Sequence, residues 1–309
     1  RMPYTFENSE ALLKNLKDAA PYISAAERFA SFKGFVYDKR INIACTSEKL
    51  ARAGFYSTAS PEFPASAKCP FCMLEINFEQ CDDPWEKHKS GSPHCEFVMI
   101  GEIEESELSF RIISNLAIRH ATVRLYEELL GIVATLENGD IANENPITRA
   151  DATRKLISFR SSSKLLTFDH RLATFQNFIF DKKRNVKCTS KKLAKAGWFS
   201  IANKKDKTSA KCPFCLVELD FDESDDPWEE HQKFSASCDF IKLGKLDEKK
   251  WTENEALMLG ARITIMQKYE KGSWLIDELE KENRIDEIIK IRKIMIKPNH
   301  VLKRRRCSI

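Results

Sequence analysis

Four residues that can bind a metal recur with identical spacing in the two halves of the chain. Each set reads Cys-x2-Cys, fifteen residues, His, six residues and Cys, and the second set lies 143 residues after the first. Structural zinc prefers thiolate and imidazole ligands, and a site filled by four protein ligands leaves no position for a reactive water. The spacing therefore predicts two structural zinc ions per chain, held by Cys69, Cys72, His88 and Cys95 and by Cys212, Cys215, His231 and Cys238.

The repetition extends beyond the metal ligands and contains no gap. A 143-residue period is far longer than the roughly 20–50 residues of solenoid repeats, so it indicates a duplicated domain. A core of roughly 70–75 residues is close to the size at which burial alone is marginal and a metal is expected to help. The matching segments are Arg28–Phe32 with Arg171–Phe175, Cys45–Gly54 with Cys188–Gly197, and Asp82–His88 with Asp225–His231.

These segments resemble the baculoviral inhibitor-of-apoptosis repeat, or BIR domain, over residues 24–100 and 167–243. The resemblance rests on an Arg-x-x-Ser/Thr-Phe opening, Cys-Pro-Phe-Cys, Asp-Asp-Pro-Trp-Glu-x-His and a final Cys-x-Phe. The gap between the second Cys and the His is one residue shorter than the commonest family spacing. The resemblance implies an α+β fold, in which a three-stranded antiparallel sheet and short helices surround zinc. The helices expected after the repeats favour the survivin-like branch.

Helical patterns fill the chain between and after the repeats. Apolar residues follow helical spacing over 106–136, and capping-box signatures begin helices at Thr148 and Thr252. We expect Gly272 to end the helix that begins at Thr252, and a further helix to run from Ser273 to about residue 296. The expected segments are an N-terminal lead (1–23), a first zinc domain (24–100), a helical linker (101–166), a second zinc domain (167–243), C-terminal helices (244–297) and a basic tail (298–309).

Composition favours an intracellular protein. No stretch of 18 apolar residues and no signal peptide is present, so we expect neither a membrane span nor secretion. Six of the ten cysteines are zinc ligands, and Cys45 and Cys188 suit small core positions better than disulfides. We therefore expect the protein to be located in the nucleus and the cytoplasm. The basic run 303–306 is either a solvated surface or a nuclear-import or nucleic-acid contact.

In the family, a peptide adds beside the third strand and carboxylates hold its free amino terminus. Residues 218–230 hold eight acids and no base, whereas residues 75–87 hold five acids and one lysine. Lys87 brings a like charge to the amine and Gly91 removes an aromatic wall, so the second repeat should bind more tightly. The alternative, that the acids only face solvent, stays open. The candidate peptide-binding residues are Leu219, Asp220, Phe221, Asp225, Glu230 and Phe234, with Ile76, Asn77, Asp82, Lys87 and Gly91 in the first repeat.

The sequence indicates an interaction module and not an enzyme. A ubiquitin-ligase RING needs eight further Cys or His ligands, and only His300 and Cys307 follow Cys238. Sequence-specific nucleic-acid binding is not expected either, because no paired His or basic domain face is present. We expect Trp85 and Trp228 to be core residues. The favoured partner is an unmodified histone tail in a chromosomal or mitotic role; the alternative is regulation of apoptosis through the N-termini of caspases or pro-apoptotic antagonists. The C-terminal helices could pack on a repeat or on a helical partner.

Overall fold

The computed structural model describes residues 14–15, 17–40, 43–138 and 148–284, together with 286, 289 and 290. It divides into two compact units, Arg1–Arg124 with Lys271–Ile309 and Leu125–Glu270. The linker expected after Asn138, the helix end expected near residue 296 and the basic run 303–306 lie outside the described residues.

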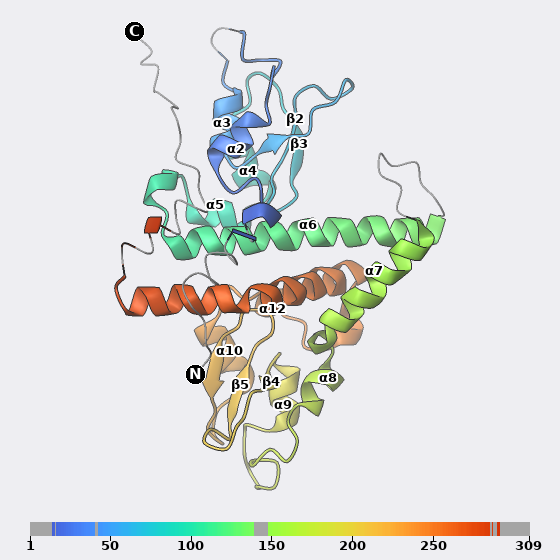
Figure 1. The fold of residues 1–309 in the computed structure, drawn as a ribbon, viewed down its shortest axis with the longest axis vertical. Coiled ribbons are helices and arrows are strands. Elements are labelled where there is room, and N and C mark those ends of the chain that lie inside the picture. Colours follow the sequence, from blue (N-terminus) through green and yellow to red (C-terminus); the bar gives the residue numbers. More distant parts are fainter. Residues whose placement is uncertain are drawn as a thin grey trace. The chain divides into compact units, whose positions relative to one another are not determined.

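The first repeat is built around a three-stranded antiparallel sheet (Figure 1). Its strands follow the order β1-β2-β3, and Ala67 pairs with Ile76, so β3 is an edge strand. Helices begin at side-chain caps, because Ser24, Thr46 and Asp83 each accept a hydrogen bond from a first-turn backbone N–H. The elements are α2 (Ala25–Ala30), α3 (Ser47–Arg52), β1 (Tyr56–Ser57), β2 (Ser66–Lys68), β3 (Glu75–Asn77), α4 (Pro84–Gly91), α5 (Glu96–Ile100) and the 3-10 turn η1 (Glu105–Glu107).

The second repeat has the same elements in the same order, each displaced by 143 residues, apart from a 3-10 turn before it. Its sheet follows the order β4-β5-β6, with β6 at the edge, and Thr189 and Asp226 cap two of its helices. The two sheets and their helices confirm the expected α+β fold. The elements are η2 (Lys164–Leu166), α8 (Phe168–Ala173), α9 (Ser190–Lys195), β4 (Phe199–Ser200), β5 (Ser209–Lys211), β6 (Glu218–Asp220), α10 (Pro227–Phe234), α11 (Asp239–Leu243) and η3 (Glu248–Lys250).

A 29-residue helix follows each repeat, and these helices also obey the 143-residue period. They are α6 (Phe110–Asn138) and α12 (Glu253–Lys281), with α7 (Arg149–Ser162) between them in sequence. The expected break at Gly272 is wrong, because α12 continues through that residue. One glycine costs only about 1 kcal/mol in a helix interior, and the helix formers on either side outweigh it. The capping box at Thr252 is confirmed: its Oγ1 accepts from Glu255 N at 3.2 Å, and Glu255 Oε2 accepts from Thr252 N at 2.8 Å.

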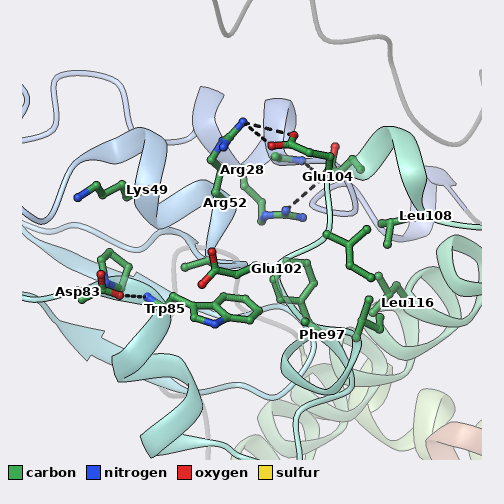
Figure 2. A pocket seen from close by; sticks show the side chains of 17 residues that line it. Arg28, Lys49, Arg52, Asp83, Trp85, Phe97, Glu102, Glu104, Leu108 and Leu116 are labelled. Carbon is green, nitrogen blue, oxygen red and sulfur yellow. Dashed lines mark hydrogen bonds and ion pairs between the residues drawn. The ribbon is translucent and has the colours of Figure 1, made fainter. Parts of the chain in front are cut away.

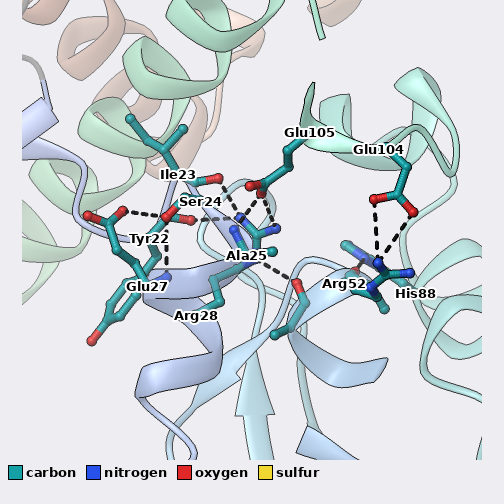
Figure 3. Close-up of polar contacts among 12 residues, drawn as sticks. Tyr22, Ile23, Ser24, Ala25, Glu27, Arg28, Arg52, His88, Glu104 and Glu105 are labelled. Carbon is teal, nitrogen blue, oxygen red and sulfur yellow. Dashed lines mark hydrogen bonds and ion pairs between the residues drawn. The ribbon is translucent and has the colours of Figure 1, made fainter. Parts of the chain in front are cut away.

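A buried arginine joins the opening helix of each repeat to the turn that precedes the long helix, and Figure 3 shows this contact for Arg28 in the first repeat. Arg28 is 1% exposed, donates to Ala51 O at 2.8 Å and Ile23 O at 2.6 Å, and pairs with Glu105 Oε1 at 3.2 Å. The second repeat reproduces this arrangement, with Arg171 paired to its glutamate at 2.9 Å. A buried guanidinium requires such partners. The Arg in the Arg-x-x-Ser/Thr-Phe opening is therefore a structural residue.

The long helices also contact the metal-ligand loops. Arg119 Nε, on α6, donates to Phe71 O at 2.9 Å, and Arg262 Nε, on α12, donates to Phe214 O at 3.2 Å. Phe71 and Phe214 lie between the first two cysteines of their sets. The part of each long helix that carries this arginine thus packs as a component of its own repeat.

The buried cysteines confirm the prediction that they are core residues, whereas the two tryptophans that precede the zinc histidines are less buried than predicted. Cys45 and Cys188 are fully buried, and burial raises the pKa of each thiol to about 12. Trp85 and Trp228 are only half-buried and pack at the margin of the core clusters. Trp198, by contrast, is fully buried. Among the described helices, none combines the length and apolar character needed to cross a bilayer.

His120 on α6 should make the first unit sensitive to acid. It is 3% exposed, and its ring nitrogens form no hydrogen bond within the described chain. Burial, assisted by the charge of Arg124, lowers its pKa to about 3, whereas an unfolded histidine titrates near 6.5. The unfolded state therefore binds more protons below pH 6.5, and the free energy of unfolding falls as the pH drops from 6.5 towards 3.

His120→Ile, which copies the equivalent Ile263, should remove this dependence. We expect the variant to gain about 2 kcal/mol over the parent between pH 7.5 and pH 5. Urea unfolding at both pH values in excess zinc measures the difference. His170→Ala, at an exposed histidine, serves as the control and should keep the parental pH dependence. An unchanged pH dependence in His120→Ile would refute the assignment.

Candidate zinc centres and peptide edge

The expected ligands converge into two compact clusters of four ligand atoms. In each set the four ligand atoms lie within 4.8 Å of one another. In the first, Cys69 Sγ lies 3.9 Å from Cys95 Sγ, and Cys72 Sγ lies 3.4 Å from His88 Nε2. The corresponding distances in the second are 3.9 and 3.6 Å. Metal–ligand bonds of about 2.0–2.3 Å give tetrahedral edges of roughly 3.3–3.8 Å, so both clusters fit Zn²⁺.

Three separate parts of each repeat supply the ligands. The first two cysteines flank the loop between the second and third strands, the histidine lies on the following helix, and the last cysteine caps the next helix. His88 Nδ1 donates to Ala53 O at 2.7 Å, and His231 Nδ1 to Ala196 O at 2.8 Å. These bonds direct Nε2 towards the metal position. Gly54, with φ of +91°, lets the chain pass the Phe97 ring, which a Cβ would approach to 2.7 Å.

The protonation of the thiols shows why a cation belongs in these clusters. Burial raises the pKa of Cys69 and of Cys212 well above the usual range. The pKa of Cys72 falls instead, because the thiols of Cys69 and Cys95 donate to its sulfur. Hydrogen bonding alone therefore stabilises one thiolate per cluster. A divalent cation supplies the charge that ionises all three.

The outer edge of β6 offers backbone groups to an added strand. In the ladder with β5, Leu219 pairs with Ala210, and Phe221 N donates to Thr208 O. Because the hydrogen-bonding direction alternates along a strand, the N–H and C=O of Glu218 and Asp220 point away from β5. The Phe221 side chain is 2% exposed within the core and its N–H is bonded to Thr208 O, so Phe221 offers a peptide neither its side chain nor its N–H. Phe78 of the first repeat is buried in the same way.

Two candidate carboxylates follow β6 in the second repeat, Asp225 in the turn before α10 and Glu230 on α10. Asp225 Oδ2 accepts from Asp222 N at 2.7 Å, which fixes the turn before α10. Glu230, on α10, has a side chain 25% exposed, and its nearest cation in the described chain is the exposed Lys233, at 3.5 Å. Among the described residues, no ion pair forms at Asp225. The pair therefore keeps negative charge that an ammonium group could neutralise.

In the first repeat, an internal lysine occupies the equivalent place. Lys87, at the position of Glu230, donates to Asp82 Oδ1 at 3.1 Å, while Asp82 Oδ2 accepts from Glu79 N at 2.9 Å. This contact raises the pKa of Lys87 through the hydrogen bond and the charge of Asp82. The contact also shows that a side chain at this helix position reaches the aspartate. The sequence indicated only a repulsive charge here; the structure shows a bound ammonium.

The aromatic wall differs between the repeats as well. Phe234, at the end of α10, is 52% exposed, with Lys233 Nζ 5.0 Å from its ring centre. In the first repeat, Leu74 covers Gly91, since a Cβ on Gly91 would lie 2.8 Å from that side chain. A large exposed aromatic ring beside an open strand edge is an available apolar contact. The second repeat has this contact and the first does not.

Sequence reasoning missed the pairs that bind the long helices to the repeats. Glu105 and Glu248, which pair with the buried arginines, lie 143 residues apart, as do Arg119 and Arg262. Extending the comparison of the two halves past residues 100 and 243 would have found them. Few residues match in that stretch, so the helical pattern hid the continued repetition.

Comparisons with known proteins agree with this geometry. The family model of the Inhibitor of Apoptosis domain, BIR, matches residues 28–99 and 171–242. The Caenorhabditis elegans "Chromosomal passenger complex protein bir-1" is 38% identical over 124 residues, which are 40% of this chain and 77% of that protein. The Xenopus tropicalis "Baculoviral IAP repeat-containing protein 5.1" is 41% identical over 95 residues, 30% of this chain and 56% of that protein. This chain thus spans just over half of the Xenopus protein.

Loss of one zinc ligand should unfold one unit. Structural zinc contributes on the order of 10–16 kcal/mol in small zinc peptides, far more than a domain of this size can lose. We expect two zinc ions per chain by elemental analysis and one in His231→Ala, which should also lose the thermal transition of the second unit. In the first repeat, His88→Ala should behave likewise, whereas the exposed His94→Ala should retain both ions. A fully folded His231→Ala protein with one zinc would contradict a structural role for the metal.

Proposed function

This chain belongs to the inhibitor-of-apoptosis (BIR) family, and we propose that its second repeat binds the free amino terminus of a partner protein. The peptide adds as a fourth strand beside β6, where the outward backbone groups of Glu218 and Asp220 meet it. Its first side chain contacts Phe234, and its ammonium lies between Asp225 and Glu230. The Phe221 side chain is buried in the core, so in this proposal it does not contact the peptide.

The observation that carries this proposal is the contrast between the two repeats. In the first, Lys87 already neutralises Asp82 at 3.1 Å, which is the contact that a peptide ammonium would have to replace. In the second, Glu230 takes the place of that lysine, and the two carboxylates face no strong internal cation within the described chain. The first repeat therefore mimics the occupied state with its own side chain. The edge strand β3 of the first repeat, which contains Ile76 and Asn77, therefore binds a peptide weakly or not at all.

For the partner, we favour an unmodified histone tail, an alanine followed by basic residues. One relative is named as a chromosomal passenger complex protein, which supports a role in cell division and in the nucleus as well as the cytoplasm. The eight acids between Glu218 and Glu230 attract a basic peptide, and the attraction extends about 8–10 Å at physiological salt. The N-termini of caspases or of pro-apoptotic antagonists form the competing class, which the family's own description supports.

The proposed role is binding without catalysis. The clustered cysteines and histidines are consumed as zinc ligands, and four protein ligands leave the metal no position for a substrate. The peptide edge offers carboxylates and a ring, but no nucleophile placed beside a base. These features support an interaction module.

Exchanging the charges at one helix position tests the amine site. Glu230→Lys should weaken binding of a free-amine peptide at least tenfold, because the new ammonium would pair with Asp225 as Lys87 pairs with Asp82. Acetylating the peptide terminus should cost about 1.5–3 kcal/mol, the usual value for hydrogen bonds to a charged group. Calorimetry with free and acetylated histone-tail and antagonist peptides measures both effects.

Two further variants serve as controls for that exchange. Lys87→Glu releases Asp82 and should give the first repeat detectable amine binding, while Lys233→Ala removes an exposed cation and should leave affinity unchanged or slightly higher. Equal affinity for free and acetylated peptides would show that the carboxylates do not hold the terminus. Tighter binding of antagonist than of histone peptides would support the apoptotic partner instead.

Phosphorylation of a threonine in such a tail should weaken binding. A phosphate adds nearly two negative charges and would enter the acidic field of residues 218–230. Val217 beside this edge offers no cation, and Lys211 on β5 is already paired with Glu218 and Glu270. We expect severalfold weaker binding of the phosphopeptide by fluorescence anisotropy, and affinity for the unmodified tail that falls with added salt. A phosphopeptide that binds more tightly would overturn the choice of an unmodified tail.

A further inference from the structure

The first repeat contains a cavity of about 300 Å³ away from the strand edge, a size near the lower end of ligand sites. Figure 2 shows Trp85 and Phe97 at its base, with Leu108 and Leu116 on the other side of Phe97 from Trp85. Glu102 contributes to the wall. Much of the lining is thus aromatic and aliphatic, with charged groups around it.

The second repeat has the same framework but carries an indole at this position. Phe97 corresponds to Phe240, and each ring lies 6.0 Å from the tryptophan of its own zinc helix. Leu108 corresponds to Trp251, whose ring meets Phe240 edge-on at 6.1 Å and 79°. Trp251 Nε1 also donates to Lys245 O at 2.9 Å. An indole therefore packs against the central phenylalanine in the second repeat, where the first has only Leu108.

At residue 108 the backbone of the first repeat matches that of the second at residue 251. Leu108 has φ and ψ of −64° and 130°, and Trp251 has −74° and 141°. Each residue's N–H bonds the carbonyl three residues earlier, at 3.4 and 3.1 Å. Glu102, the counterpart of Lys245, lines the cavity, but the glycine before it has a ψ of 179° where Gly244 has 8°. The two repeats thus share the backbone at residue 108 and differ in the side chain there and in the glycine turn that precedes Glu102 and Lys245.

We propose that this pocket binds the side chain of a tryptophan presented by a partner protein. The indole would pack on Phe97 as Trp251 packs on Phe240, and its N–H would donate to an oxygen of Glu102 in the wall. The site is separate from the peptide edge and does not depend on the proposed function. The two repeats would then contact partners through different surfaces.

The full-length zinc-loaded chain can be titrated with N-acetyl-tryptophanamide and followed by protein NMR. A fragment of this size should bind with a Kd of roughly 0.1–1 mM. The benzothienyl analogue has the same shape but no N–H, and it should bind about three- to tenfold more weakly because one hydrogen bond is lost. N-acetyl-leucinamide should bind at least tenfold more weakly than the tryptophan derivative. Shifts should be largest at Phe97 and Glu102.

Exchange of the residues at 108 and 251 provides matched variants. Leu108→Trp fills the pocket with the chain's own indole and should reduce binding more than tenfold, while Trp251→Leu should open a second site and raise the stoichiometry from one to two. Zinc content and the thermal transitions establish that each variant is folded. Unchanged binding in folded Leu108→Trp, or no binding to the parent chain, would overturn the proposal. Binding of free indole without N-acetyl-tryptophanamide would also overturn it, since the pocket would then admit only a small molecule.

Discussion

Each repeat depends on one buried metal-binding cluster. The first cluster takes its ligands from the loop between β2 and β3, from α4 and from the start of α5. A sheet of two- and three-residue strands has too few ladder hydrogen bonds and too little apolar area to hold these elements by itself. Zinc joins them directly, and α4 then carries the side chains that face the strand edge. The position of the candidate peptide site is therefore a consequence of metal binding.

A second constraint extends this small core. Buried Arg28 and Arg171 satisfy backbone carbonyls within their repeats and pair with the glutamates that precede the long helices. Arg119 and Arg262 then bond the carbonyls of the metal-ligand loops. Each arginine donates to a backbone carbonyl of another segment, and so joins the helix to the zinc domain. The duplicated unit is accordingly a zinc domain together with its helix.

One scaffold with a few exchanged side chains gives two different surfaces. Lys87 and Gly91 close the edge of the first repeat, where Glu230 and Phe234 leave the second open. At position 108 the relation is reversed, because Leu108 leaves a cavity in the first repeat and Trp251 supplies an indole in the second. Duplication with exchange at these positions preserves the metal site and the buried arginines, since none of these exchanges alters a metal ligand or a buried arginine.

The sequence by itself determined the zinc ligands, the duplication and the α+β fold, because ligand spacing and repeated motifs are local properties of the chain. It also placed the caps at Thr148 and Thr252, which depend on neighbours three residues away. It wrongly predicted that Gly272 ends a helix, because the helix formers around this glycine outweigh its low propensity. It assigned Phe221 to the peptide site and Trp85 and Trp228 to the core, because the sequence does not show how deeply each side chain is buried. Only the tertiary structure decided that Lys87 neutralises Asp82, that Glu105 pairs with Arg28, and that Leu108 stands where the second repeat has an indole. These are contacts between segments distant or offset in sequence, and their distances are set by how the zinc-bound elements pack.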